Sequence, residues 1–312
     1  MISSVCTLFE GNYHFGVATL SNSLYNHGFR GTVYVGYRGE LPSWVEYKKN
    51  SFSDDVKDFE LIPAEGLIIK FVYLETTNHF TNYKPKFMKD LMEKYNNIEN
   101  LFYFDPDIVV NEDFSFYLEW INAGITVCED INSPIQEFHP RRVGWRTFFK
   151  KHGIDLSFKN SIYVNGGFIG VKRHQIEFLD LWIKTQDLAT ELVGGLQVSF
   201  LDRIEVMMFN VFDQDCLNAS IEAYNGTISF IGKEGMGFSI GGYKTMYHAL
   251  GSYKPWNVNI MLRSFQGRPP RNVDVEYWKN TNYPILAHSK GEIRKKQIAI
   301  KIGKLIGRFY KV

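Results

Sequence analysis

The feature that most constrains the fold is the alternation, in the first half of the chain, of short apolar runs with segments of helical periodicity. Apolar runs of this length are typical of buried strands, and apolar residues at helical spacing are typical of helices packed on a sheet. Strands separated by helices predict βαβ units, and therefore an α/β fold with a mainly parallel central sheet. The expected strands are residues 3–9, 31–38, 65–74, 100–110, 123–131 and 161–173, and the expected helices are residues 15–28, 84–95 and 173–192.

Length and composition indicate a single large domain. With 312 residues, 45% of them hydrophobic, the chain can bury a large core. It contains no linker, internal repeat or low-complexity block. We predict an α/β domain over residues 1–256 and a C-terminal extension over residues 257–312 that ends in a basic amphipathic helix.

Two absences bear on the compartment. Cys6, Cys128 and Cys216 lie far apart without metal-binding spacing, so neither a disulfide framework nor a zinc site is expected. The N-terminus lacks the basic and apolar segments of an export signal, and the best apolar run, residues 66–74, is short and interrupted by Lys70. We expect no membrane span and a cytoplasmic location.

The last 23 residues are strongly basic. Residues 290–312 hold eight Lys or Arg and one Glu, a net charge of +7, whereas the whole chain carries +1, so the remainder is at −6. A basic helix with an apolar stripe suits an anionic membrane surface, where each cation adds about 1 kcal/mol. The alternative is a terminal helix that docks on its own domain. We predict peripheral association with the inner face of the cell membrane. The apolar residues at near-helical spacing are Ile298, Ile300, Ile302, Leu305, Ile306 and Phe309.

The run "LFYFDPDIVV", residues 101–110, places two carboxylates in an apolar context. Asp105 and Asp107 project to the same face of an extended segment, and Pro106 favours a turn there. Burying carboxylates costs several kcal/mol unless something compensates them. Mg²⁺ or Mn²⁺ would do so, because both prefer hard oxygen ligands and share their shell with substrate phosphates. The alternative is a pair of exposed loop aspartates.

Three later stretches carry further polar groups beside glycine or at the start of an expected helix. "YVNGGFIGVKR" places an amide beside two glycines in an apolar strand, where backbone can approach a ligand closely. "VFDQDCLNAS" opens a helical pattern with an acid–amide–acid triplet, and "YHALGSYKPW" joins an imidazole, a glycine and a lysine. The residues concerned are Asn165, Gly166, Asp213, Gln214, Asp215, His248, Gly251 and Lys254.

Taken together, "YFDPD", "NGGF", "DQDxLN" and "HxxGxxKPW" resemble the motifs of the retaining GT-A glycosyltransferases, the family that includes glycogenin and the bacterial lipopolysaccharide α-galactosyl- and α-glucosyltransferases. The resemblance runs from about residue 8 to residue 256. "EGNYHFG" also fits the opening of that family, except that Glu10-Gly11 stands where an acidic pair is usual. The resemblance implies a GT-A fold, a Rossmann-like nucleotide-diphospho-sugar transferase domain.

The resemblance also implies the roles of individual residues. Asp105, Asp107 and His248 would bind Mn²⁺ or Mg²⁺, and Lys254 with the backbone of Gly251 would hold the diphosphate of a nucleotide-sugar donor. The remaining expected site residues are Asn12 and Tyr13 at the base and ribose, Asn165 and Gly166 at the donor sugar, and the catalytic residues Asp213 and Gln214, one or the other of which would lie below the anomeric carbon.

A basic residue upstream of the paired aspartates also reaches the donor in this family. "NYKPKFMKDL" offers Lys84 and Lys86, and the spacing does not decide between them. Of the two, we predict Lys86 as the residue that contacts the donor.

These roles predict a glycosyltransferase of bacterial surface polysaccharide or lipopolysaccharide synthesis. It would move a hexose from a nucleotide-diphosphate sugar, a UDP-sugar, to a glycan or glycolipid hydroxyl with retention. The alternatives are an inverting GT-A transferase, with Glu129 or Asp130 as base, and a non-catalytic, membrane-associated nucleotide-sugar binding protein.

The basic and aromatic segment 139–153 is interpreted as a lid or acceptor loop, since the acidic body of the chain argues against nucleic acid as a partner.

Overall fold

The computed structural model of the chain describes residues 2–46, 50–51, 57–197 and 208–310; Lys311, which the predicted basic helix includes, lies outside them. The described residues form two compact units. The first contains residues 2–8, 74–104 and 117–233, and the second contains residues 9–73, 105–116 and 234–310, apart from the gaps. Each unit is assembled from segments that are distant in the sequence.

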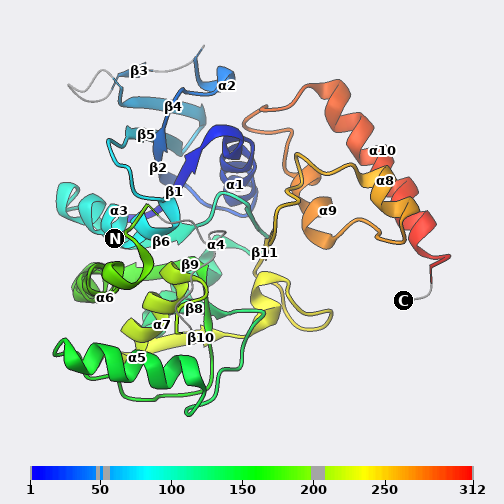
Figure 1. Ribbon diagram of the computed structural model, residues 1–312. Helices are drawn as coiled ribbons and strands as arrows, with labels where there is room; N and C mark the ends of the chain where they lie inside the picture. The colour runs from blue at the N-terminus through cyan, green and yellow to red at the C-terminus, as the bar shows by residue number, and fades with distance from the viewer. Residues whose placement is uncertain (1, 47–49, 52–56, 198–207, 311–312) are drawn as a thin grey trace. The chain divides into compact units, whose positions relative to one another are not determined.

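The described part of the first unit contains a sheet in the order β10-β8-β9-β6-β1 (Figure 1). β6 is parallel to β1 and β8 is parallel to β10, whereas β9 is antiparallel to both β6 and β8. All of these strands except β9 therefore run in one direction, which confirms the predicted α/β class. The strands are β1 (Ile2–Glu10), β6 (Ile98–Phe104), β8 (Ile125–Glu129), β9 (Val164–Lys172) and β10 (Ile228–Ile231).

Helices α3, α6 and α7 of the first unit pack on one another, with α3 against β6 and α7 against β9. α3 begins after His79, whose ring nitrogen accepts a hydrogen bond from the Thr81 backbone N–H and so caps the helix. The helices are α3 (Phe80–Lys94), α4 (Phe114–Trp120, which begins in the second unit), α5 (Pro140–Lys151), α6 (Glu177–Val193) and α7 (Phe212–Ala223), with 3-10 turns η2 (Ile121–Ala123) and η3 (Arg173–Gln175).

The second unit contains strands β2 and β5 in parallel, with β4 antiparallel to β5 and β3 antiparallel to β4. A separate ladder pairs β7 with β11 antiparallel. The strands are β2 (Gly31–Arg38), β3 (Asn50–Ser51), β4 (Phe59–Ala64), β5 (Leu67–Tyr73), β7 (Ile108–Val110) and β11 (Met246–His248).

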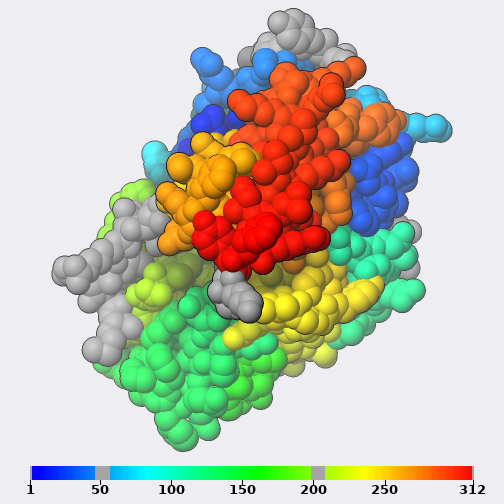
Figure 2. Space-filling model, turned by 90° about the vertical axis from the view of Figure 1, so that its right-hand side faces the viewer, coloured from blue at the N-terminus to red at the C-terminus, as the bar shows by residue number. Residues whose placement is uncertain are grey.

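The C-terminal helices pack within the second unit. α10 buries Ile293 and Ile300 in a cluster that includes Tyr277 and Trp278 of α9 and Val109 of β7, and it lies beside α8 on the face shown in Figure 2. The helices of this unit are α1 (His14–Asn26), α2 (Ser43–Glu46), α8 (Ile260–Phe265), α9 (Asn272–Lys279) and α10 (Lys290–Gly307), with 3-10 turns η1 (Gly11–Tyr13) and η4 (Lys233–Met236).

Two segments differ from the expectation. The run expected as one strand over residues 100–110 divides into β6 and β7, because the chain turns at Asp105 and the Ile108 N–H donates to the Asp105 carbonyl. Residues 139–153, interpreted as a lid or acceptor loop, instead form helix α5. Trp145 is fully buried there, because the aromatic residues of this segment recur at helical spacing and form one inward face.

Candidate functional site

The β7–β11 ladder brings the paired aspartates to His248. His248 lies opposite Ile108 in the register of the two strands, and the next residue, Ala249, donates its backbone N–H to the Asp107 carbonyl at 3.1 Å. The turn at Asp105 and this antiparallel pairing therefore place two carboxylates and an imidazole together, although His248 lies far from the aspartates in the sequence.

The three side chains form a cluster suited to a divalent cation. The Nε2 atom of His248 lies 3.3 Å from Asp107 Oδ1 and 3.6 Å from Asp105 Oδ2, and one ligand atom from each residue lies within 4.8 Å of the others. Two carboxylates and an imidazole are ligands that Mn²⁺ accepts. The buried Nδ1 atom of His248 has no hydrogen-bond partner in the described part of the chain, so described protein groups do not hold the ring in place through this atom.

Lys254 contacts the same aspartate from the other side. Its Nζ lies 2.5 Å from Asp107 Oδ2 and donates to the Ala249 carbonyl at 2.7 Å. Burial alone would raise the pKa of Asp107, but His248 and Lys254 outweigh it and hold that pKa well below its usual range. Burial lowers the pKa of Lys254, and the Asp107 carboxylate more than reverses this, so the lysine keeps its charge.

Helix α1 supports the aspartate turn at a single close contact. A methyl group on Gly16 would lie 2.0 Å from the Pro106 carbonyl oxygen and 3.0 Å from the Trp256 ring. These separations are shorter than van der Waals contact, so a glycine is needed where the first turn of α1 meets the backbone between Asp105 and Asp107.

The other expected residues of the second unit lie near Lys254. The ring of Tyr13 packs edgewise on Trp256 at 5.5 Å between centroids, and Lys254 Nζ is 5.8 Å from the centre of the Tyr13 ring. Asn12 is exposed beside Tyr13 in η1. Gly251 is exposed and has a φ of +79°, a conformation that favours glycine, with no atom within 4 Å of where a Cβ would stand.

The first unit brings together the residues expected at the donor sugar. Lys84 of α3 is buried, and its Nζ donates to Asp213 Oδ2 at 3.2 Å and to the Gly166 carbonyl at 2.9 Å. The Gly166 N–H donates to Gln214 Oε1 at 2.9 Å. Helix α7 therefore presents Asp213 and Gln214 from its first turn to the beginning of β9.

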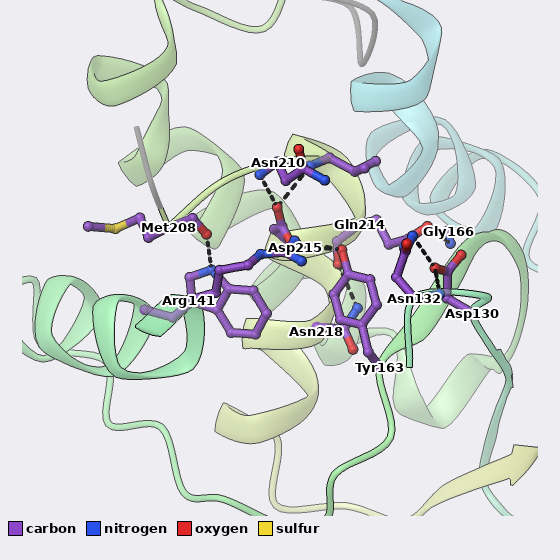
Figure 3. A network of polar contacts seen from close by, with 12 residues as sticks. Asp130, Asn132, Arg141, Tyr163, Gly166, Met208, Asn210, Gln214, Asp215 and Asn218 are labelled. Atoms are coloured by element: carbon purple, nitrogen blue, oxygen red, sulfur yellow. Dashed lines mark hydrogen bonds and ion pairs between the residues drawn. The ribbon is translucent and has the colours of Figure 1, made fainter. Parts of the chain in front are cut away.

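Asn165 is fixed by a neighbour on β9 and by the residue that follows β8. Its Oδ1 accepts from the Gly167 N–H at 2.8 Å, and its Nδ2 donates to Asp130 Oδ2 at 2.6 Å. The other carboxylate oxygen of Asp130 accepts from both the backbone and the side-chain nitrogen of Asn132. Figure 3 shows this part of the network beside Gly166.

Asp215, the third member of the acid–amide–acid triplet, is fully buried and binds four groups (Figure 3). One oxygen accepts from the Tyr163 hydroxyl at 2.7 Å and pairs with the Arg141 guanidinium, and the other accepts from the backbone N–H groups of Asn210 and Val211. Burial raises the pKa of Asp215 to about 6, although Arg141 and these hydrogen bonds favour its ionised form. Asp215 thus ties the start of α7 to α5 and to the residue that precedes β9.

The structure separates the two candidate lysines of α3. Lys86 is exposed and pairs with Asp90 at 3.0 Å one turn along the same helix, so the structure does not bring it to the Asp213 cluster, whereas Lys84 lies within it. Arg141 and Tyr163 were not among the expected residues. Arg141 could have been found from the basic character of residues 139–153, but nothing in the sequence marks Tyr163.

Solved structures of glycosyltransferases resemble this chain. They include the bifunctional glycosyltransferase WbbM (TM-score 0.53, 15% identity, covering 95% of this chain and 52% of that one), the glycosyltransferase GlyE of Streptococcus pneumoniae TIGR4 (0.53, 14%, 97% and 64%) and the galactosyltransferase LgtC in complex with donor and acceptor sugar analogues (0.52, 11%, 94% and 99%). The chain has their fold. It is the GT-A type of α/β fold that the motifs implied.

The likeness has clear bounds. The chain spans about half the length of WbbM and about two thirds of GlyE, and at 11–15% identity the comparison establishes the fold alone. No protein-family model matches the chain, and no curated protein is similar to it in sequence.

Proposed function

We propose that the chain is a metal-dependent glycosyltransferase that moves a hexose from a nucleotide-diphosphate sugar, a UDP-sugar, to a hydroxyl of a glycan or glycolipid. The observation that carries the proposal is the convergence of Asp105, Asp107 and His248 on one point, with Lys254 bound to Asp107. A fold shared with solved glycosyltransferases supports it.

The second unit would bind the nucleotide diphosphate. Asp105, Asp107 and His248 would hold Mn²⁺ or Mg²⁺, which when bound offsets the negative charge that develops on the leaving diphosphate. Lys254, already charged and anchored by Asp107, would add a second positive group there, since an ammonium donates in several directions. Tyr13 would stack its ring on the base, and Asn12 would contact the base and ribose. The exposed backbone of Gly251 would contact the diphosphate.

The first unit would bind the sugar. The side-chain oxygen of Gln214 accepts a hydrogen bond from the Gly166 N–H. The side-chain amide nitrogen of Gln214 is therefore the group that can donate to a ligand. Asp213 and Gln214 would lie beneath the sugar ring, where a carboxylate and an amide stabilise an oxocarbenium-like carbon. Lys84 replaces Lys86 as the proposed basic contact, because it binds both Asp213 and the Gly166 carbonyl.

The proposed reaction retains the configuration of the anomeric carbon. The bond from this carbon to the β-phosphate oxygen breaks, a bond to the acceptor oxygen forms on the same face, and the acceptor proton passes to the departing phosphate oxygen. An inverting reaction would instead need a carboxylate as base. Asp130 fits that role poorly, because both of its oxygens accept hydrogen bonds from Asn132 and Asn165.

The test is transfer from a panel of UDP-sugars to glycan and glycolipid acceptors with Mn²⁺, with NMR of the product linkage. We expect an α-linked product from an α-linked donor, loss of activity in EDTA, and at least a hundredfold lower turnover in Asp105→Ala. Asp113→Ala, an exposed aspartate of the same segment, is the matched control and should retain activity. Full activity in EDTA would refute the metal role, and a β-linked product would refute retention.

We also propose that α10 holds the protein on an anionic membrane surface at the cytoplasmic face, near a membrane-bound acceptor. Ile298, Ile302 and Leu305 are 49%, 40% and 54% exposed, at a spacing of four and three residues that forms one stripe, and Phe309, just beyond the helix, is 85% exposed. The exposed basic residues Arg294, Lys295, Lys301, Lys304 and Arg308 flank it. Among the described residues, no helix has the length and apolar character needed to cross a bilayer.

Truncation would not test this proposal cleanly, because α10 also buries Ile293 and Ile300 in the core of the second unit. The double variant Ile302→Ser and Leu305→Ser changes only exposed side chains. We expect it to reduce co-sedimentation with anionic vesicles at least tenfold, and we expect added salt to weaken wild-type binding. Ile62→Ser, a comparably exposed isoleucine of β4, should bind like the wild type. Equal binding of the double variant would contradict the proposal.

A further inference from the structure

The chain between His248 and Lys254 forms a short exposed loop in the second unit. We call residues 250–253 the Gly251 loop. Residues 251–253 are exposed, and no atom lies within 4 Å of where a Cβ of Gly251 would stand. A loop with so little packing of its own keeps a single shape only if other parts of the unit hold its backbone.

Arg271, which directly precedes helix α9, spans the Gly251 loop. Its Nη1 donates to the Leu250 carbonyl at 3.3 Å, and its Nη2 donates to the Tyr253 carbonyl at 2.6 Å. A guanidinium suits this task because its donors form a rigid planar fork. One side chain therefore fixes the first and last residues of the loop relative to each other.

Asp274 fixes the fork in turn. Arg271 donates from Nε to Asp274 Oδ2 at 3.0 Å and from Nη2 to Oδ1 at 2.8 Å, and its backbone N–H also donates to Oδ2. Asp274 is buried in the first turn of α9, the helix that places Tyr277 and Trp278 in the core of the second unit. Because both carboxylate oxygens bind Arg271, the position of α9 determines the orientation of the guanidinium.

Helix α9 also holds the chain on the other side of Lys254. The Nε1 atom of Trp278 donates to the Pro255 carbonyl at 3.3 Å. The helix packs against β11, the strand that ends at His248 (Figure 1). The segment from the proposed metal ligand to the proposed phosphate contact is therefore supported throughout by α9 and the residue before it.

These contacts leave the amide groups of the loop available. The carbonyls of its first and last residues accept from Arg271. No group in the described part of the chain accepts a hydrogen bond from the backbone N–H of Gly251, Ser252 or Tyr253. Successive N–H groups beside a residue of positive φ can form an anion-binding concavity, and Gly251 has a φ of +79°. A phosphate of the nucleotide diphosphate is an anion suited to such a loop.

We propose that Arg271 is a positioning residue for donor binding: held by Asp274, it keeps the Gly251 loop in the shape that binds the diphosphate. A loop that is already ordered loses less conformational entropy when its ligand binds. The C-terminal extension, to which both residues belong, therefore completes the donor site. The inference rests on the proposed function, since it takes the diphosphate as the ligand of the loop.

The test compares three variants of the full-length protein. Arg271→Ala removes the fork. Arg271→Lys keeps a positive charge beside Asp274, but its single nitrogen cannot span the two carbonyls, so this variant tests the fork without removing the ion pair. Arg268→Ala, the matched control, removes the same charge from an exposed side chain three positions earlier. Calorimetry with Mn²⁺ gives the Kd of UDP, competition gives that of uridine, which has no phosphate, and a titration without nucleotide gives that of Mn²⁺.

Both Arg271 variants should bind UDP about tenfold more weakly, an effect that loss of loop preorganisation can produce. The Kd of uridine and the Kd of Mn²⁺ should stay unchanged. The KM for the UDP-sugar should rise with the Kd of UDP while kcat changes little, because the loop contributes to ground state and transition state alike. Arg271→Lys should melt close to the wild type, and Arg268→Ala should match the wild type in every measurement.

Several results would overturn the inference. Unchanged UDP affinity in both Arg271 variants is one, and wild-type affinity in Arg271→Lys is another, because charge rather than the fork would then suffice. Equal weakening of UDP, uridine and Mn²⁺ would indicate general damage to the second unit and would also overturn it. A wild-type protein that binds no UDP in the presence of Mn²⁺ would instead refute the proposed function, and the inference with it, so the two failures are distinguishable.

Discussion

At the scale of single residues, Asp107 divides its two oxygens between two partners. Oδ2 contacts the Lys254 ammonium, and Oδ1 faces His248 Nε2 at 3.3 Å. The lysine therefore orients the carboxylate and leaves one oxygen directed at the cation site. Asp105 is more exposed and faces His248 at the longer distance of 3.6 Å, so the two aspartates have unequal structural roles.

This difference predicts unequal stability effects. Asp107→Ala leaves the buried Lys254 without its carboxylate, and removing one member of a buried ion pair costs about 3 kcal/mol. Asp105→Ala should lower the free energy of unfolding by less than about 1 kcal/mol, because its side chain is partly hydrated. Urea denaturation without divalent metal measures both. Equal losses in the two variants would show that Lys254 does not depend on Asp107.

Asp215 predicts a dependence of stability on pH. Burial raises its pKa from 3.8 to about 6, so the folded state disfavours the ionised carboxylate. Its contribution to the free energy of unfolding is therefore full below about pH 4 and is lost as the pH rises through about 6, by on the order of 3 kcal/mol. Relative to Asp215→Asn, which does not titrate, the wild type should lose stability between pH 4 and pH 7. A constant difference over this range would contradict the raised pKa.

The sequence predicted the motif residues better than their partners. The resemblance of "YFDPD" and "HALGSYKPW" to the motifs of a known family singled out the three side chains that the structure brings together, Asp105, Asp107 and His248. The choice between Lys84 and Lys86 could have been made from periodicity: Lys84 lies in register with the buried Phe80, Phe87, Met88 and Leu91 of α3, whereas Lys86 faces solvent. The partner Tyr163 could not be predicted, since its hydroxyl meets Asp215 only through the tertiary packing of β9 on α7.

At the scale of elements, the position of the aspartate turn depends on how closely α1 approaches it. Gly16→Ala would place a methyl group 2.0 Å from the Pro106 carbonyl, so α1 or the turn must move. We expect a loss of about 1–3 kcal/mol in the free energy of unfolding, typical of overpacking, and weaker Mn²⁺ binding by calorimetry. Gly291→Ala, in the first turn of α10 with no atom near the new methyl group, is the control and should be neutral or slightly stabilising.

Helix α5 shows why composition misled the interpretation of its segment. Basic and aromatic residues between two motifs suggested a lid or acceptor loop, but two arginines of α5 form buried ion pairs with α7. Arg141 pairs with Asp215, and Arg142 pairs with Glu222 while donating to the carbonyls of Ile135 and Ile162. Their acidic partners lie more than seventy positions away along the chain, so the charge pattern of the segment alone resembles a solvated surface.

At the scale of the whole molecule, the residues proposed for the diphosphate all belong to the second unit and those proposed for the sugar belong to the first. The alternation of strands and helices was enough to predict the α/β class. It could not predict this division, because each unit combines segments from distant parts of the chain, and only tertiary packing decides which segments join.

The proposed roles of Asp105 and Asp213 predict how ligands stabilise the protein against heat. UDP with Mn²⁺ should raise the melting temperature by about 5 °C at a hundred times its Kd, because a ligand that binds only the folded state adds about 2.7 kcal/mol. Asp105→Ala should abolish this shift. Asp213→Asn should keep the shift with UDP but lose the further increase given by the correct UDP-sugar, since Asp213 is proposed to meet the sugar alone. Loss of the UDP shift in Asp213→Asn, with Asp113→Ala unchanged, would contradict the assignment of Asp213 to the sugar.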